Sequence, residues 1–201
     1  MPDFLFYKEE NKLKKTIVKN GYALLTTTWT EGKAKDAYEK ITWLDSAEAG
    51  CSSFEADPQG DTSEVYADGQ CVYSQEENGG YSIKTTIIDA IDKVKEVWLG
   101  DKKHTKGTAE YAGSTKPYFA YLIIEETTDG KGKTTVYYNC QASRPKLSGS
   151  TSENGKFDFK QTEFELTARK RMSDNLVKAE FDGMELLDQV PLPLPTEGAS
   201  V

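Results

Sequence analysis

Histidine is almost absent from this chain of 201 residues, and cysteine is scarce. The single histidine, His104, sits in a lysine-rich stretch that reads as an exposed loop. A His-based triad, a His-ligated metal centre or a histidine general base would therefore rest on one surface residue. The cysteines Cys51, Cys71 and Cys140 are odd in number and widely spaced. We expect neither a disulfide framework nor a zinc site.

Long hydrophobic runs and the common catalytic motifs are missing as well. No stretch approaches the roughly 18 apolar residues of a membrane span, and residues 1–10 do not resemble a secretion signal. We therefore expect a protein that is made and kept in the cytosol, without membrane contact. Phosphate-binding, dinucleotide-binding, GxSxG and HExxH motifs are absent, so standard nucleotide, hydride and metallopeptidase chemistries have no support. The chain is predicted not to be an enzyme and to need no cofactor.

Basic residues are missing from residues 41–83, which hold no Lys, Arg or His. The acidic residues in this stretch are Asp45, Glu48, Glu55, Asp57, Asp61, Glu64, Asp68, Glu76 and Glu77. The negative charge of these residues exceeds the net charge of −8 for the whole chain, so the acidity is a local feature. A surface of one sign either repels or attracts charged partners, although a solvated loop would show the same composition.

Aromatic and β-branched residues concentrate in short runs between turn signals, which is typical of strands. Strands are predicted over residues 22–29, 38–44, 64–67, 70–74, 81–87, 118–125, 134–141, 156–168 and 176–181, with the last two as partners. Asp68-Gly69 and residues 129–132 read as hairpin turns. Ile91, Val94 and Trp98 recur at helical spacing before Gly100, which predicts one short helix that Asp89 can cap.

This pattern predicts a mainly β fold, a β-sandwich or partial barrel of about eight to ten strands with one short flanking helix. Residues 1–20 are expected to form an N-terminal arm or first strand, and residues 21–188 the sandwich domain. Within that domain, residues 44–80 are expected to form a long acidic loop region, with residues 44–63 as one loop. Residues 189–201 form a Pro-rich C-terminal extension.

A nucleic-acid binder should present a clustered basic face. The candidate residues are Arg144, Lys146, Lys156, Lys160, Arg169, Lys170 and Arg171, and Glu153, Asp158, Glu163 and Glu165 interrupt them. Tight DNA binding is therefore disfavoured. A mixed basic region could instead meet an acidic region of a neighbouring copy, which points towards self-assembly.

Three segments carry a resemblance to a known family. They are Val65-Tyr66-Ala67-Asp68-Gly69, then Gly79-Gly80-Tyr81-Ser82-Ile83, and, after the short helix, Lys116-Pro117-Tyr118-Phe119-Ala120 at the start of a hairpin. In this order, over roughly residues 15–185, the chain resembles the major tail proteins of long-tailed phages, especially phages of Gram-positive hosts. The resemblance implies a non-enzymatic β-sandwich whose hexameric rings stack into a tail tube around a channel for the phage genome.

The resemblance also implies a location and partners. The protein would belong to the virion tail and to the host cytoplasm during assembly, with the tape-measure protein, tail tip and tail terminator as partners. Double-stranded DNA would pass without specific binding, because a negative wall does not hold a polyanion back. Under this reading Glu64, Asp68, Glu76 and Glu77 are predicted to line the channel, whereas Asp45, Glu48, Glu55, Asp57 and Asp61 would lie in a loop between rings.

Two other functions stay open at the level of sequence. A monomeric β-sandwich binding module of a virion or cell surface, with a carbohydrate or protein ligand, would use exposed Trp29 and Trp43 as stacking platforms. Both tryptophans sit in strand-like runs, however, which favours a place in the core. A carboxylate-based hydrolase is the weaker alternative, because chance pairs abound among 33 acidic residues.

Overall fold

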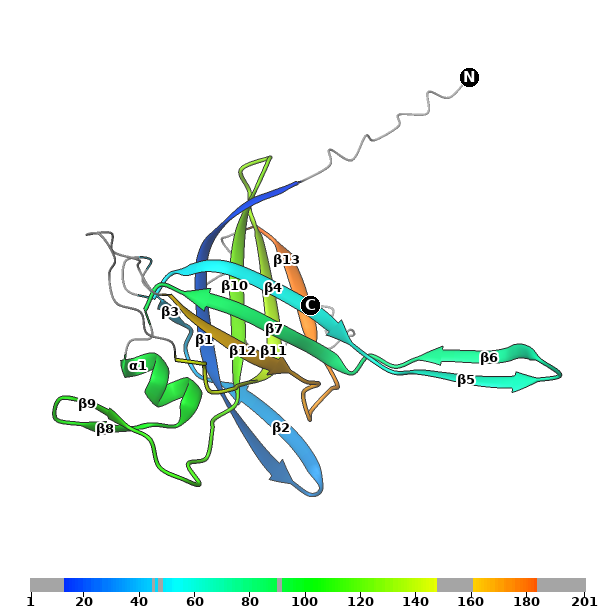
Figure 1. The fold of residues 1–201 in the computed structure, drawn as a ribbon, viewed down its shortest axis with the longest axis horizontal. Coiled ribbons are helices and arrows are strands. Elements are labelled where there is room, and N and C mark those ends of the chain that lie inside the picture. Colours follow the sequence, from blue (N-terminus) through cyan, green and yellow to red (C-terminus); the bar gives the residue numbers. More distant parts are fainter. Residues whose placement is uncertain (1–12, 45, 47–48, 90–91, 148–160, 184–201) are drawn as a thin grey trace.

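The computed structural model describes residues 13–44, 46, 49–89, 92–147 and 161–183, and it is mainly β (Figure 1). The strands are β1 (Lys14–Thr30), β2 (Lys33–Tyr38), β3 (Thr42–Leu44), β4 (Cys51–Gln59), β5 (Thr62–Ala67), β6 (Gln70–Glu76), β7 (Gly80–Ile87), β8 (Lys102–His104), β9 (Gly107–Ala109), β10 (Phe119–Thr127), β11 (Lys133–Ala142), β12 (Thr162–Ala168) and β13 (Lys178–Asp182). The described residues contain one helical segment, in which α1 (Asp92–Val94) continues directly into the π-helical turn η1 (Lys95–Leu99). The predicted fold class is confirmed.

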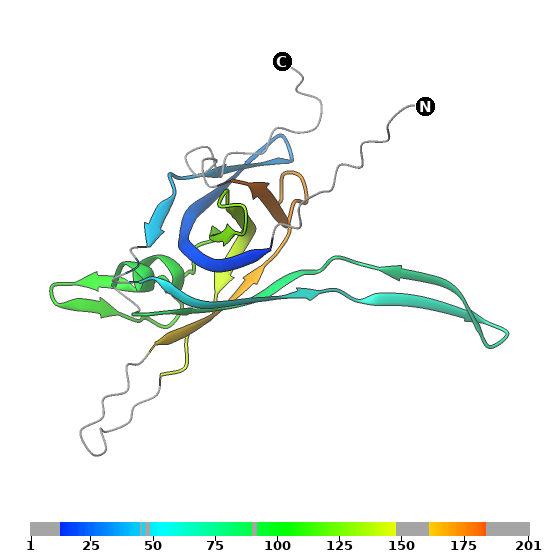
Figure 2. The same cartoon turned by 90° about the horizontal axis from the view of Figure 1, so that it is seen from above.

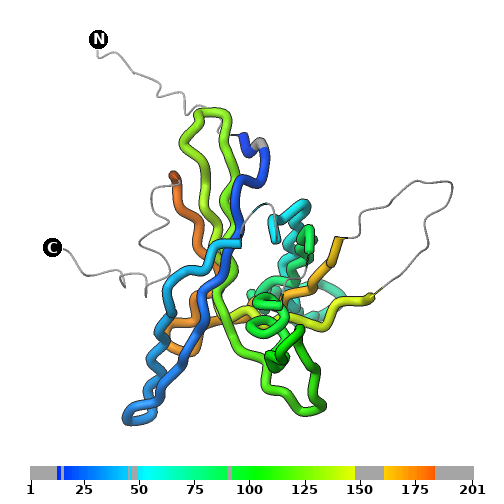
Figure 3. The backbone as a smooth tube through the Cα atoms, turned by 90° about the vertical axis from the view of Figure 1, so that its left-hand side faces the viewer, coloured from blue at the N-terminus to red at the C-terminus, as the bar shows by residue number. Residues whose placement is uncertain are grey.

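Nine of these strands form one antiparallel sheet, with the order β2-β1-β10-β11-β12-β7-β4 and with β3 on β1 and β13 on β11. Strand β1 joins two parts of this sheet, because Leu24 still pairs with Phe119 of β10 whereas Leu25 already pairs with Tyr38 of β2. The sheet folds over, so that β1, β10, β11 and β13 face β12, β7 and β4 (Figure 3). The result is a sandwich in which β2 and β4 end the main strand order, and β3 and β13 likewise have one strand partner each among the described residues.

The principal core lies between these layers, and Trp98 of η1 is at its centre. The Trp98 ring stacks on Phe119 with centroids 5.3 Å apart and meets Phe164 edge to face at 5.1 Å. Gly100 ends the helical segment in a left-handed conformation, with φ 71°, where a Cβ atom would lie 2.5 Å from the carbonyl oxygen of Thr115. The predicted stop at Gly100 is confirmed, and it fixes where the next hairpin leaves the domain.

A second, smaller core covers the other face of β10. Ala120 and Leu122 alternate with the residues of the first core and pack with Val136 and Tyr138 of β11. Since both faces of β10 are covered, its first six residues are all buried. This arrangement explains why residues 118–125 read in the sequence as a nearly continuous apolar run.

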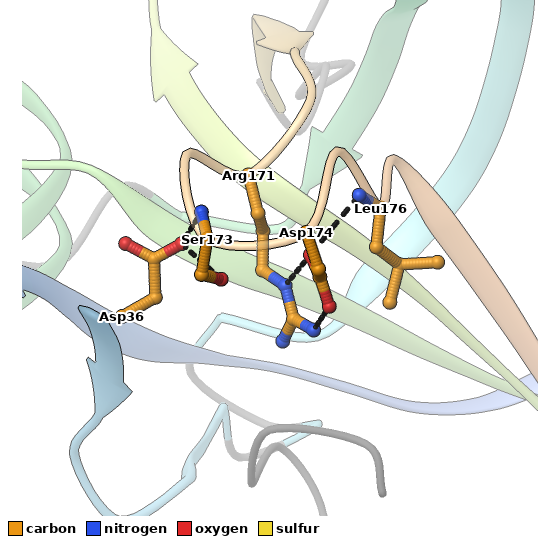
Figure 4. Close-up of polar contacts among 5 residues, drawn as sticks. All are labelled: Asp36, Arg171, Ser173, Asp174 and Leu176. Carbon is orange, nitrogen blue, oxygen red and sulfur yellow. Dashed lines mark hydrogen bonds and ion pairs between the residues drawn. The ribbon is translucent and has the colours of Figure 1, made fainter. Parts of the chain in front are cut away.

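Buried Arg171 lies over Tyr138 of this second core and bonds to Asp174, as Figure 4 shows for the latter contact. Its guanidinium carbon lies 4.7 Å from the centroid of the Tyr138 ring, and its Nε donates to Asp174 Oδ1 over 2.9 Å. Asp174 Oδ1 also accepts from the backbone N–H of Leu176 at 3.1 Å. The pKa of the Asp174 carboxyl is lowered, mainly by the hydrogen bond from Arg171, which outweighs the effect of its burial. These contacts fix the turn between β12 and β13.

Three details differ from the predictions. The loop expected over residues 44–63 is wrong, because residues 51–59 form strand β4. Pro58, which read as a turn signal, lies on an edge strand, where a missing backbone donor is tolerated. The strand predicted over residues 38–44 is interrupted between β2 and β3.

The third difference is a strand partner. Residues 176–181 were expected to pair with residues 156–168, but β13 pairs with β11, and β12 pairs with β7 and β11. Residues 14–20 belong to β1. The N-terminal residues 1–12, the C-terminal extension 189–201, and Asp45, Glu48 and Ile91 lie outside the described residues.

Candidate assembly surface

The most exposed element of the fold is the hairpin of β5 and β6, which we call the arm (residues 60–79). It projects from the sandwich as a two-stranded ribbon (Figures 1 and 2). Every residue of β5 and β6 is exposed. The arm prolongs the edge pair β4 and β7, since Gly79 N–H donates to the Gln59 carbonyl over 2.7 Å and Glu77 N–H to the Asp61 carbonyl over 3.0 Å.

Local sequence accounts for the shape of the arm. At its tip, Asp68 and Gly69 adopt φ values of 52° and 78°, as a tight two-residue hairpin turn requires. The hairpin predicted from this dipeptide is confirmed. At its base the strands approach closely at Gly60, where a Cβ atom would lie 2.2 Å from the Glu77 carbonyl oxygen.

Residues that pair across the two strands share a face of the arm, so the pairing register assigns each residue to a face. The two faces differ in charge. One face, the acidic face, holds the pairs Thr62 with Glu76, Glu64 with Ser74, and Tyr66 with Cys71. The opposite face, the uncharged face, holds Ser63 with Gln75, Val65 with Tyr73, and Ala67 with Gln70. Tyrosine–side-chain hydrogen bonds follow this division: the Tyr66 hydroxyl donates to Glu64 at 2.7 Å, and that of Tyr73 to Gln75.

Large hydrophobic side chains on the arm stand in solvent. Their exposed fractions are 55% for Val65, 63% for Tyr66, 61% for Val72 and 53% for Tyr73. A two-stranded hairpin without a packed face is at best marginally stable in water. Val65 and Tyr66 belong to a segment that carries the resemblance, but none of the four residues was predicted from the sequence to contact a partner. Their strand-like pattern was visible, but an exposed strand and a half-buried one share it.

The structure brings together the four residues predicted to line the channel, since Glu64, Asp68, Glu76 and Glu77 all belong to the arm. Asp61, predicted for an inter-ring loop, lies at the base of the same arm. The other two described residues of that group, Glu55 and Asp57, are exposed on β4. Within the described part of the chain, no ion pair neutralises the carboxylates of the arm.

A separate cavity of about 550 Å³ lies beside β1, β3 and β4. It is lined by Ile17, Val18, Lys19, Asn20, Trp43, Leu44, Ser46, Gly50, Cys51 and Ile88. Buried Asn20 has no hydrogen-bond partner for its Nδ2 among the described residues, and burial raises the pKa of the Cys51 thiol. The Lys19 ammonium lies 4.6 Å from the Trp43 ring centroid and so covers one face of the indole.

The two tryptophans considered as stacking platforms differ in position. Trp29, near the end of β1, is 65% exposed, so its expected place in the core is wrong. Trp43 is half-buried and packs against the second core, in agreement with the expectation. Trp29 lies on the part of β1 that pairs only with the edge strand β2, where no second layer covers it.

No protein-family model matches this chain, and a search of curated proteins finds no match. Among the described residues, no group of three or more His, Cys, Asp or Glu side chains is placed to hold a metal ion. No helix in the described part of the chain has the length and apolar character needed to cross a membrane.

Proposed function

We propose that this protein is the structural subunit of a phage tail tube, which works by assembling into hexameric rings that stack around a channel for the genome. The observation that carries the proposal is the arm, a long exposed ribbon with unburied Val65, Tyr66, Val72 and Tyr73. A surface of this kind gains stability only when another molecule covers it. The proposed covering molecule is a second copy of the chain.

The free edges of the sheet support the same reading. Strands β2 and β4 end the strand order and leave one row of backbone groups each without a strand partner among the described residues. Exposed edges invite pairing with other chains, and ring closure satisfies them in a controlled way. Contacts between different surfaces of identical subunits close into rings or continue as open filaments, depending on the rotation between copies.

In this proposal the protein has no catalytic residue, and double-stranded DNA passes through the channel without specific binding. A tape-measure protein, a tail tip and a tail terminator remain the expected partners, on the basis of the family resemblance alone. The proposed channel wall is acidic. Its candidate residues Glu64, Asp68, Glu76 and Glu77 all lie on the arm, so their lining role requires that the arm reaches the channel.

Electron microscopy of the purified protein at rising concentration, combined with sedimentation velocity, tests the proposal. We expect rings or hollow tubes with a regular axial repeat. A matched control replaces residues 62–76 with Asn-Gly, which joins β4 to β7 through a tight turn and removes the arm from the otherwise intact domain. This variant should stay folded and monomeric. A wild-type protein that remains monomeric at every concentration would contradict the proposal.

The cavity beside Asn20 and the exposed Trp29 favour a second candidate, the monomeric binding module. An exposed indole suits stacking on a sugar ring or packing against a protein ligand. For this candidate the wild type should stay monomeric, and Trp29→Ala should abolish binding on a glycan array while leaving the fold unchanged. Assembly into tubes, with no glycan bound, would remove it.

A further inference from the structure

A second exposed hairpin, formed by β8 and β9, has the opposite charge to the arm. We call it the basic hairpin (residues 101–110). Lys102, Lys103 and Lys106 are exposed on it, and no described carboxylate forms an ion pair with any of these lysines. The Lys102 ammonium lies 5.0 Å from the centroid of the Tyr111 ring, and His104 Nε2 lies 3.2 Å from the Tyr111 hydroxyl.

The two carboxylates of the basic hairpin offset these lysines only in part, because both contact Arg144, whose positive charge balances one of them. Arg144 Nη1 lies 3.1 Å from Asp101 Oδ1, before β8, and 2.8 Å from Glu110 Oε2, after β9. Arg144 therefore clamps both ends of the hairpin at its base. The cationic side chains beyond the clamp remain available to a partner.

The basic hairpin and the acidic arm lie at opposite ends of the molecule. Two perpendicular views agree on this arrangement: the arm extends from one end of the long axis, and β8 and β9 extend from the other (Figures 1 and 2). The two hairpins of one chain therefore cannot meet each other. Two copies placed end to end, by contrast, bring an acidic ribbon next to a basic one.

We propose that the arm of one copy docks on the basic hairpin of the next copy, with Glu64 and Glu76 of the acidic face opposite Lys103 and Lys106. The occupant is a second copy because this same chain provides the complementary charge. Complementary patches fix register and accelerate encounter. The contact joins two different surfaces, so it propagates head to tail and closes only if the rotation between copies allows. This inference deepens the proposed function and rests on it.

The docking contact gives the carboxylates of the arm a different task from the channel wall predicted from the sequence. The two tasks lead to opposite results when the charge of the arm is reversed. If Glu64 and Glu76 line a channel, their replacement by lysine leaves assembly intact. If they contact the lysines of a neighbour, the replacement brings like charges together and assembly is lost.

Charge reversal at both ends tests the contact. The arm variant is E64K/E76K, the hairpin variant is K103E/K106E, and a third protein carries all four changes. Controls of equal charge change are E39K/E163K and K131E/K170E, whose residues are exposed outside both hairpins and outside the edge strands β2 and β4. Circular dichroism and thermal melting check that each variant is folded. Assembly is measured by sedimentation and electron microscopy at low ionic strength, where charge contacts count most.

We expect each of the two reversed variants to need at least about tenfold more protein than the wild type before rings appear, whereas the controls match the wild type. The variant that carries all four changes should recover assembly, because charge complementarity between the two hairpins is restored. An equimolar mixture of the arm variant and the hairpin variant should also assemble, with alternating subunits.

Different results overturn different claims. Normal assembly of E64K/E76K and K103E/K106E overturns the docking contact and leaves the tube proposal standing. The contact is also overturned if both variants lose assembly and neither the variant with all four changes nor the mixture recovers it, because the charges then do not act as a pair. A wild type that stays monomeric overturns the contact and the tube proposal together.

Discussion

Asp36 on β2 accepts two hydrogen bonds from Ser173, which lies 137 residues later in the turn before β13 (Figure 4). Its Oδ2 receives the backbone N–H at 3.1 Å and the hydroxyl at 2.8 Å. Burial raises the pKa of Asp36, but the hydrogen bonds from Thr27 and Ser173 outweigh it and hold the pKa below its ordinary value. This one carboxylate ties the edge hairpin of β1 and β2 to the turn that also carries Arg171.

Replacement of Asp36 by alanine should therefore destabilise the domain. The change removes the acceptor of Thr27, which is half-buried, and of Ser173, which is exposed, so that water replaces part of each lost interaction, and one such hydrogen bond contributes about 0.5–1.5 kcal/mol. We expect a loss of that size per hydrogen bond in the free energy of unfolding, measured by urea titration. Glu39→Ala, at an exposed position just after β2, is the matched control. Equal stability of the two variants would show that the link carries no weight.

The second prediction concerns the stability of the domain in acid, to which Glu180 on β13 contributes. Hydrogen bonds from Lys133 and Lys178 lower the pKa of Glu180 to about 2, from an ordinary value of 4.5. A carboxylate with a lowered pKa in the folded state stabilises the protein above its ordinary pKa, and this contribution disappears as pH falls through the lowered value. Stability should thus decline between about pH 4.5 and pH 2.

The variant Glu180→Gln separates this carboxylate from the others. It keeps the shape of the side chain but cannot ionise, so its melting temperature should fall less steeply with acid than that of the wild type. Asp36 and Asp174, whose pKa values are also lowered, contribute a decline of the same sign that persists in the variant. Parallel melting curves for variant and wild type over this pH range would rule out a role for Glu180.

Arg144 supplies a third prediction, concerning the basic hairpin. Arg144→Gln removes the ion pairs to Asp101 and Glu110 without touching the three exposed lysines. Such partly exposed pairs contribute about 0.2–1 kcal/mol each, so the domain should stay folded. The base of the hairpin should loosen, and assembly should need more protein than in the wild type. Lys146→Ala, at an exposed position nearby, provides the control. Unchanged assembly of the Arg144 variant would show that the clamp does not support assembly.

Local signals predicted those parts of the fold that local chemistry decides. The Asp68-Gly69 turn, the β10 and β11 hairpin, the β7 strand and the stop at Gly100 all follow from short runs of sequence. Strand β4 could not be predicted in this way, because Asp57-Pro58 is a turn signal that an edge strand tolerates. The partner of β13 depends on how the whole sheet folds over, and no short run encodes that.

The candidate surface shows the same limit. The sequence located the acidic residues, and the resemblance suggested where they would lie in a tube. Neither indicated that Glu64 and Glu76 share one face of the arm while Val65 and Tyr73 share the other. That division depends on the register of β5 with β6, in which a shift beside Val65 places two consecutive residues of one strand opposite one of the other. The basic hairpin was visible only as a lysine-rich loop, with no indication that it lies at the far end of the molecule.

The last prediction concerns the uncharged face of the arm. The salt dependence of assembly distinguishes the contribution of this face to assembly from that of the acidic face. Val65→Ser combined with Tyr73→Ser removes the two large side chains of the uncharged face and leaves every charge in place. If this face is buried against a neighbour, the variant should assemble poorly at all salt concentrations, because apolar contacts are not screened. Contacts of the acidic face should weaken as salt rises, since the screening length falls from about 10 Å at 0.1 M to about 3 Å at 1 M. Sedimentation of the wild type and of the serine variant over a range of salt concentrations measures both effects. If wild-type assembly weakens with salt but persists, while the serine variant does not assemble, then one face of the arm contributes apolar packing and the opposite face contributes charge pairing. Normal assembly of the serine variant would leave the arm held by charge alone.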